Sequence, residues 1–74
     1  MPVVLTAVPN GRLIRERRIR KGFPTQEAFG NKIGKGQSWI SAIENGREAS
    51  FATLCVVAEE LGMDVDEIIL AEVA

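Results

Sequence analysis

The sequence contains no histidine, and its single cysteine is Cys55. These shortages exclude zinc sites built from cysteine and histidine, acid–base catalysis by an imidazole, and a disulfide within the chain. We interpret Cys55 as a small apolar residue beside the core, since a disulfide at this position would have to join two chains. No nucleophile stands beside a base and no inward carboxylates are paired, so we expect neither an enzyme nor a cofactor.

The sequence also lacks long hydrophobic runs. Its longest, residues 2–9 and 68–71, are far shorter than the roughly 20 residues that span a bilayer. No basic region precedes the N-terminal apolar stretch, so we expect no signal peptide and a cytoplasmic location. With 74 residues, of which 46% are apolar and 26% charged, the chain is predicted to form one globular domain with a thin core.

The net charge is small, but the charges are unevenly placed. A net charge of −1 and a pI of about 5.3 argue by themselves against nucleic-acid binding. All nine lysines and arginines, however, lie in residues 1–47 with three acids, whereas residues 48–74 hold seven acids and no base. Binding follows the local field, so the split favours one basic and one acidic surface. The alternative is that these charges only solvate helix faces.

Glycines and prolines divide the chain into short segments in which apolar residues recur every three or four positions, the spacing of helices. Asn10, Thr25 and Ser50 are suitable N-caps, because their side chains accept hydrogen bonds from the free amides of a first helical turn. The sequence therefore predicts an all-α, compact five-helix bundle in residues 10–74. Its helices are expected at about 11–21, 26–33, 37–45 and 51–61, with a fifth from residue 64.

Residues 1–9 are predicted to form a separate N-terminal arm or strand. Val3, Val4 and Leu5 resemble a short β-strand, but no partner strand is evident elsewhere in the sequence. Three alternatives stay open for this segment. It pairs with its copy in a dimer, packs loosely on the bundle, or is disordered.

The second and third predicted helices are joined by Gly34, Lys35 and Gly36, and two short helices across a tight glycine-containing turn indicate a helix-turn-helix. The outward face of the third helix supports this interpretation, because it lacks the Lys and Glu of an ordinary solvated helix. Its side chains are short and uncharged, as a helix needs in order to approach base edges in the major groove of DNA. The face consists of Gln37, Ser38, Ser41, Ala42 and Asn45.

Glu44 is unusual for its position. It lies four residues after the apolar Ile40 and therefore points a carboxylate toward the core, where an unpaired charge is costly. Arg18, four residues after the inward Ile14 of the first helix, is the natural partner. We predict an ion pair between Arg18 and Glu44 that fixes the third helix on the first. The alternative is that both side chains reach solvent.

From residue 18 to residue 70 the chain resembles the Cro and lambda-repressor type of helix-turn-helix, often called the Xre family. The resemblance depends on the order and spacing of six fragments: Arg-x-x-x-Gly at 18–22, Thr-Gln-Glu at 25–27, Ile-Gly at 33–34, Ile-x-x-Ile-Glu-Asn-Gly at 40–46, Thr-Leu at 53–54 and Ala-x-x-Leu-Gly at 58–62. It implies a lambda-repressor-like bundle that binds double-stranded DNA, with Arg18 and Glu44 as the salt bridge between its helices.

The resemblance also implies which residues contact DNA. Gln37 and Ser38 would enter the major groove first, while Asn45 and Arg47 would grip backbone phosphate after the third helix. The whole set implied in this way is Gln26, Lys35, Gln37, Ser38, Trp39, Ser41, Ala42, Asn45 and Arg47.

Other members of this set have two interpretations. Gln26 is either a phosphate ligand at a helix N-terminus or an ordinary helix-start residue. Trp39 either packs on the second helix or donates its indole N–H to phosphate. Lys35, and Lys32 from outside this set, flank the turn and are candidates for phosphate contact, although a solvated role fits Lys32 at least as well.

Three residues around the turn depart from the family's usual pattern. Gly30 stands where alanine is common, Lys35 replaces an apolar turn residue, and Gly36 replaces a Ser or Thr cap. The departure at Gly30 concerns a loop and not the reading face, whereas those at Lys35 and Gly36 concern how the third helix begins and where it aims. On its reading face, Ala42 offers a methyl group where relatives present a hydrogen-bonding side chain.

We therefore expect a repressor-like, sequence-specific transcriptional regulator that binds a pseudo-palindromic site as a homodimer. Apolar residues at both ends of the chain, Val3 to Leu5 and Leu70 with Val73, are candidates for a two-fold interface. The alternative is a protein-interaction module on the same fold, such as an antitoxin that binds a toxin through the acidic second half.

Overall fold

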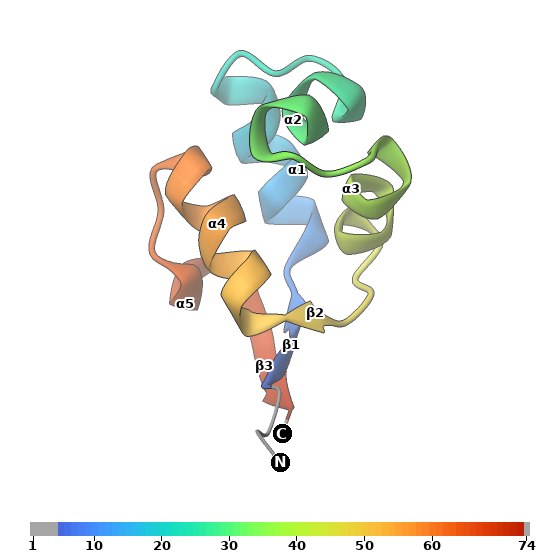
Figure 1. The fold of residues 1–74 in the computed structure, drawn as a ribbon. Helices are drawn as coiled ribbons and strands as arrows, with labels where there is room; N and C mark the ends of the chain where they lie inside the picture. The colour runs from blue at the N-terminus through green and yellow to red at the C-terminus, as the bar shows by residue number, and fades with distance from the viewer. Residues whose placement is uncertain (1–4, 74) are drawn as a thin grey trace.

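The structure is a computed structural model that describes residues 5–73, and these residues form five helices and three short strands (Figure 1). In chain order the elements are β1 (Thr6–Pro9), α1 (Gly11–Arg20), α2 (Gln26–Ile33), α3 (Gln37–Glu44), β2 (Ala49–Ser50), α4 (Phe51–Leu61), α5 (Val65–Ile68) and β3 (Ile69–Val73). The helices gather around one core, while β1 and β3 form a ribbon that extends away from α2 and α3 (Figure 1).

The predicted N-caps are confirmed. The side chain of Asn10 accepts a hydrogen bond from the Leu13 amide, Thr25 accepts one from the Ala28 amide at 3.0 Å, and Ser50 caps α4 in the same way. Each cap satisfies an amide that the helix itself leaves unpaired. The first four predicted helices consequently begin where the sequence places them, and α1 and α3 each end one residue earlier than expected.

The core collects apolar side chains from all five helices and from β1. On α4 the side chains of Leu54, Val57, Ala58 and Leu61 are buried, whereas Phe51 at the start of the helix is only half-buried. Phe23, just before α2, meets the Phe29 ring edge-on at 5.2 Å between ring centroids. The buried apolar set is Ala7, Ile14, Phe29, Ile40, Ile43, Leu54, Val57, Ala58, Leu61 and Ile68.

The prediction that the N-terminal strand has no partner in the chain is wrong. The strand lies at residues 6–9, and it is the central strand of a sheet with the order β2-β1-β3. Both neighbours are antiparallel to β1: Thr6 faces Ser50 of β2 on one side and Val73 of β3 on the other. Pairing within the chain thus replaces all three alternatives for residues 6–9. Val3 and Val4 lie outside the described residues.

The C-terminal segment supplies β3, one of the two strands that pair with β1. A fifth helix begins after Asp64 as predicted, but it ends at Ile68, and Ile69–Val73 continues as β3. The Asn10 amide donates to the Ile68 carbonyl at 2.6 Å, and from there β3 pairs with β1. The backbone groups of β3 therefore find hydrogen-bond partners in a sheet. The fold is therefore a helical bundle with a small three-stranded sheet, and the expectation of a purely all-α protein is corrected.

Candidate nucleic-acid interface

The helix-turn-helix is formed by α2, the link at residues 34–36 and α3. Gly34 ends α2 in the left-handed conformation, with φ at +74°, which a glycine adopts without steric cost. The amides of Gly34 and Lys35 both donate to the carbonyl of Gly30, which closes the end of the helix. These bonds turn the chain sharply, so that only three residues separate α2 from α3.

Gly30 is required by this turn. A Cβ atom at residue 30 would lie 2.5 Å from the carbonyl oxygen of Lys35, a backbone atom that cannot move aside. Glycine in place of the family's alanine therefore allows the turn to approach α2 closely. At the other end of the link, Gly36 caps α3 without a side-chain hydrogen bond. The carbonyl of Gly36 accepts from the amides of Trp39 and Ile40.

Lys35 and Trp39 contact each other at the start of α3. The Lys35 ammonium lies 5.2 Å from the centroid of the Trp39 ring, within the range of a cation–π interaction. Trp39 is half-buried and packs against the core. A lysine thus stands in the usual place of an apolar turn residue, with its ammonium over an aromatic ring.

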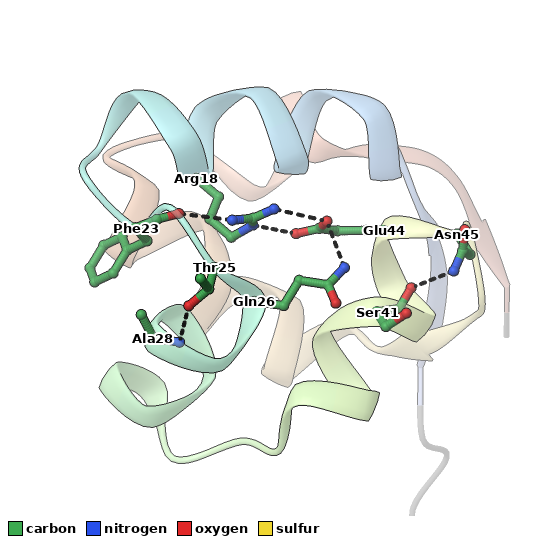
Figure 2. Close-up of polar contacts among 8 residues, drawn as sticks. All are labelled: Arg18, Phe23, Thr25, Gln26, Ala28, Ser41, Glu44 and Asn45. Carbon is green, nitrogen blue, oxygen red and sulfur yellow. Dashed lines mark hydrogen bonds and ion pairs between the residues drawn. The ribbon is translucent and has the colours of Figure 1, made fainter.

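The outward face of α3 is accessible, as the sequence predicts. Gln37, Ser38 and Asn45 are exposed and Ser41 and Ala42 half-buried, whereas Ile40 and Ile43 on the opposite side are buried in the core. Asn45 closes the helix, and its side-chain amide donates to the carbonyl of Ser41 at 2.9 Å (Figure 2). The five residues of this face carry no charge.

The predicted ion pair between Arg18 and Glu44 is confirmed. Arg18 Nε donates to Glu44 Oε2 at 2.7 Å, and both side chains are 5% exposed. A further guanidinium nitrogen, Nη1, donates to the carbonyl of Phe23 at 2.8 Å, so the arginine also holds the loop before α2 (Figure 2). In the described residues no buried side-chain polar atom is left without a partner. The pair consequently joins α1, the loop and α3.

Gln26 joins this network, a contact that the sequence analysis missed. Its side-chain amide donates to Glu44 Oε1 at 3.1 Å, so the first residue of α2 is tied to the last residue of α3 (Figure 2). The amide still has a second N–H, and the first turn of α2 supplies free backbone amides. Gln26 is therefore both a structural residue and a candidate anion ligand.

A polar cavity of about 290 Å³ opens next to this network. The exposed Arg15 lines it, and its positive charge is not paired with a carboxylate in the described residues. Sequence reasoning counted Arg15 only among the basic residues. Its spacing of three from the inward Arg18 was the signal that the two side chains lie on one side of α1. The lining residues are Arg15, Arg18, Pro24, Gln26, Glu44 and Asn45.

Two other basic residues singled out in the sequence, Arg47 and Lys32, do not line this cavity. Arg47 is exposed beyond α3, and its amide donates to the Ala42 carbonyl. Lys32 lies 3.9 Å from Glu60 of α4 with its side chain 60% exposed, which agrees with the solvated interpretation. Residues 5–73 contain no group of three or more potential metal ligands among His, Cys, Asp and Glu, and no helix in this range has the length and apolar character needed to cross a membrane.

A comparison with known protein families assigns the chain to one of them. Residues 11–69 match a family described as a helix-turn-helix domain. A comparison with curated proteins and another with solved structures returned no match. The matched range covers α1 to α5 and contains every residue that the resemblance to the Xre type assigns to DNA contact. The chain belongs to the helix-turn-helix domain family.

Proposed function

We propose that the protein is a sequence-specific, repressor-like transcriptional regulator that binds a pseudo-palindromic operator as a homodimer. The observation that carries the proposal is the outward face of α3. This face is uncharged, and it is exposed at Gln37 and Ser38. The buried ion pair between Arg18 and Glu44 fixes α3 to α1. Family membership supports DNA binding, while base specificity, symmetry and regulation are part of the proposal.

Phosphate contacts would come from the border of this face. Gln26 and Arg15 line the cavity beside α3, and Asn45 and Arg47 follow the helix. Cations and amides at these positions would set the depth of α3 in the groove without reading bases. Gln37, whose amide suits a bidentate contact with adenine, would then read sequence together with Ser38. A DNA-binding role of this kind fits the cytoplasmic location expected from the sequence.

Selection of bound sites from random double-stranded DNA, repeated over a series of salt concentrations, tests the proposal. We expect an enriched site with two related halves, about 34 Å apart from centre to centre, and affinity that falls steeply as salt rises. Enrichment of single halves without symmetry would contradict the homodimer. No enrichment even at low salt would overturn DNA reading and favour the interaction module.

A further inference from the structure

Lys35 is held at both ends of the residue. Its backbone amide donates to the Gly30 carbonyl at 2.8 Å, which fixes it at the end of α2. Its ammonium lies 5.2 Å from the centroid of the Trp39 ring, and Trp39 packs against the core from α3. A lysine side chain in solvent occupies many rotamers, so contacts at both ends restrict where this ammonium lies.

The charge of Lys35 remains available to a ligand. No carboxylate in residues 5–73 forms an ion pair with its ammonium. An aromatic face attracts an ammonium through the ring quadrupole and does not neutralise it. Lys35 also belongs to the link that leads into α3, two residues ahead of Gln37. A positive charge is therefore held next to the end of α3 at which the proposed reading face begins.

Trp39 lies on one flank of α3, and Glu44 lies on the other. At about 3.6 residues per turn, the buried Ile40 and Ile43 fall between these two side chains around the helix. The outward face of α3 is therefore bordered by Trp39 on one side and by Glu44 with its partner Gln26 on the other. A helix in a major groove lies between two phosphate backbones, so the two borders would meet different DNA strands.

We propose that Lys35 binds a backbone phosphate on the DNA strand opposite the one near Gln26, and that the Trp39 ring positions its ammonium for this contact. The inference rests on the proposed function, since it requires α3 to lie in the major groove. Trp39 acts through its ring face, and its indole N–H is not needed. Holding the ammonium in place before DNA arrives reduces the conformational entropy that is lost on binding.

Affinities measured over a salt series, for the selected half-site and for a random duplex, test the phosphate contact. We expect Lys35→Gln to lower the slope of log affinity against log salt by about 1 and to keep the base preference. Lys32→Gln is the matched control and should leave the slope unchanged, because Lys32 lies three residues earlier and is paired with Glu60. Equal slopes for the two variants would overturn the inference.

Two substitutions of Trp39 test its positioning role. Trp39→Phe keeps a ring face and removes the indole N–H, whereas Trp39→Leu keeps an apolar side chain and removes both. We expect Lys35→Gln to weaken binding about 2- to 10-fold in the wild type and in Trp39→Phe, but less than about 2-fold in Trp39→Leu, where the ammonium is no longer held. An effect equally large in Trp39→Leu, or equally small in Trp39→Phe, would overturn the positioning role.

Fluorescence tests the contact between the two side chains without DNA. The sequence has one tryptophan and no tyrosine, so the emission reports on Trp39 alone. A charge close to an indole changes its emission, and Lys35→Gln should therefore alter the spectrum while Lys32→Gln should not. Identical spectra for the wild type and Lys35→Gln would contradict the contact.

Sequence preference separates this inference from the proposed function. If the wild type prefers one site but Lys35→Gln and Lys32→Gln give equal slopes, the inference fails and base reading stands. If the wild type binds all duplexes alike while Lys35→Gln still lowers the slope, base reading fails and the phosphate contact of Lys35 stands. Absence of binding to any duplex would overturn both.

Discussion

Arg18 Nε lies 2.7 Å from Glu44 Oε2, and this ion pair connects the last turn of α1 with the last residue of α3. Both side chains are 5% exposed, so neither charge is compensated by water if its partner is removed. Gln26 and the Phe23 carbonyl complete the hydrogen bonding around the pair. The orientation of α3 on the bundle thus depends on one buried polar network.

We predict that Glu44→Ala lowers the free energy of unfolding by about 3–5 kcal/mol, because it leaves the Arg18 guanidinium buried and unpaired. Urea denaturation followed by circular dichroism measures the change. Glu60→Ala is the matched control, since Glu60 meets Lys32 at 3.9 Å in a pair whose side chains are 27% and 60% exposed, and its loss should cost less than about 1 kcal/mol. Similar losses in the two variants would show that the buried pair has no special role.

Replacing both charges should recover much of the loss. In Arg18→Met with Glu44→Leu, no uncompensated charge remains in the interior, and apolar groups of similar volume fill the space. We expect the double variant to be more stable than Glu44→Ala in the same denaturation experiment. A double variant as unstable as Glu44→Ala would mean that packing, rather than an unpaired charge, accounts for the loss.

We predict that Gln37→Ala relaxes base preference at one position of the half-site and costs roughly 1–3 kcal/mol of binding free energy on the preferred sequence. The physical reason is the loss of a side-chain amide that bonds a base edge. Gln26→Ala should instead weaken all sequences alike, since Gln26 lies at the border of α3 beside Glu44. Titration of both variants against every substitution in the half-site distinguishes them. Unchanged selectivity of Gln37→Ala would contradict the register assigned to α3.

Arg15→Gln should reduce the dependence of binding on salt. Each phosphate contact that is lost lowers the slope of log affinity against log salt by about 1, with little change in sequence preference. Arg20→Gln removes an equally exposed charge from the same helix, and Arg20 does not line the cavity beside Gln26. Affinities measured over a salt series give the slopes. Equal slopes for the two variants would remove Arg15 from the DNA interface.

We predict opposite effects for two glycines at the turn. Gly30→Ala places a Cβ 2.5 Å from the Lys35 carbonyl oxygen and should destabilise the protein by about 1–3 kcal/mol. Gly36→Ser meets no close atom, its φ of −74° suits any residue, and the new hydroxyl is able to cap α3. It should therefore stabilise by a few tenths of a kcal/mol. Thermal unfolding of both variants checks the signs, and a stabilising Gly30→Ala would show that the turn has room for alanine.

The helices, their caps and the inward positions of Arg18 and Glu44 followed from the sequence because they depend on local spacing. Asn10, Thr25 and Ser50 bond to amides three residues ahead, and Glu44 and Arg18 were placed inward by their spacing of four from Ile40 and Ile14. The uncharged face of α3 is another property of helical spacing. These features could be predicted without any knowledge of how distant segments meet.

Only the tertiary structure determined the pairing of the strands, the contact of Gln26 with Glu44 and the close approach of Gly30 to Lys35. Thr6 and Val73 are 67 residues apart in sequence, and no local pattern indicates that two short apolar segments at opposite ends of the chain will pair. Gln26 reaches Glu44, and Gly30 approaches Lys35, only after α2 and α3 have packed. Spacing along one helix determines which face a residue occupies, but the packing of separate elements determines what that residue meets.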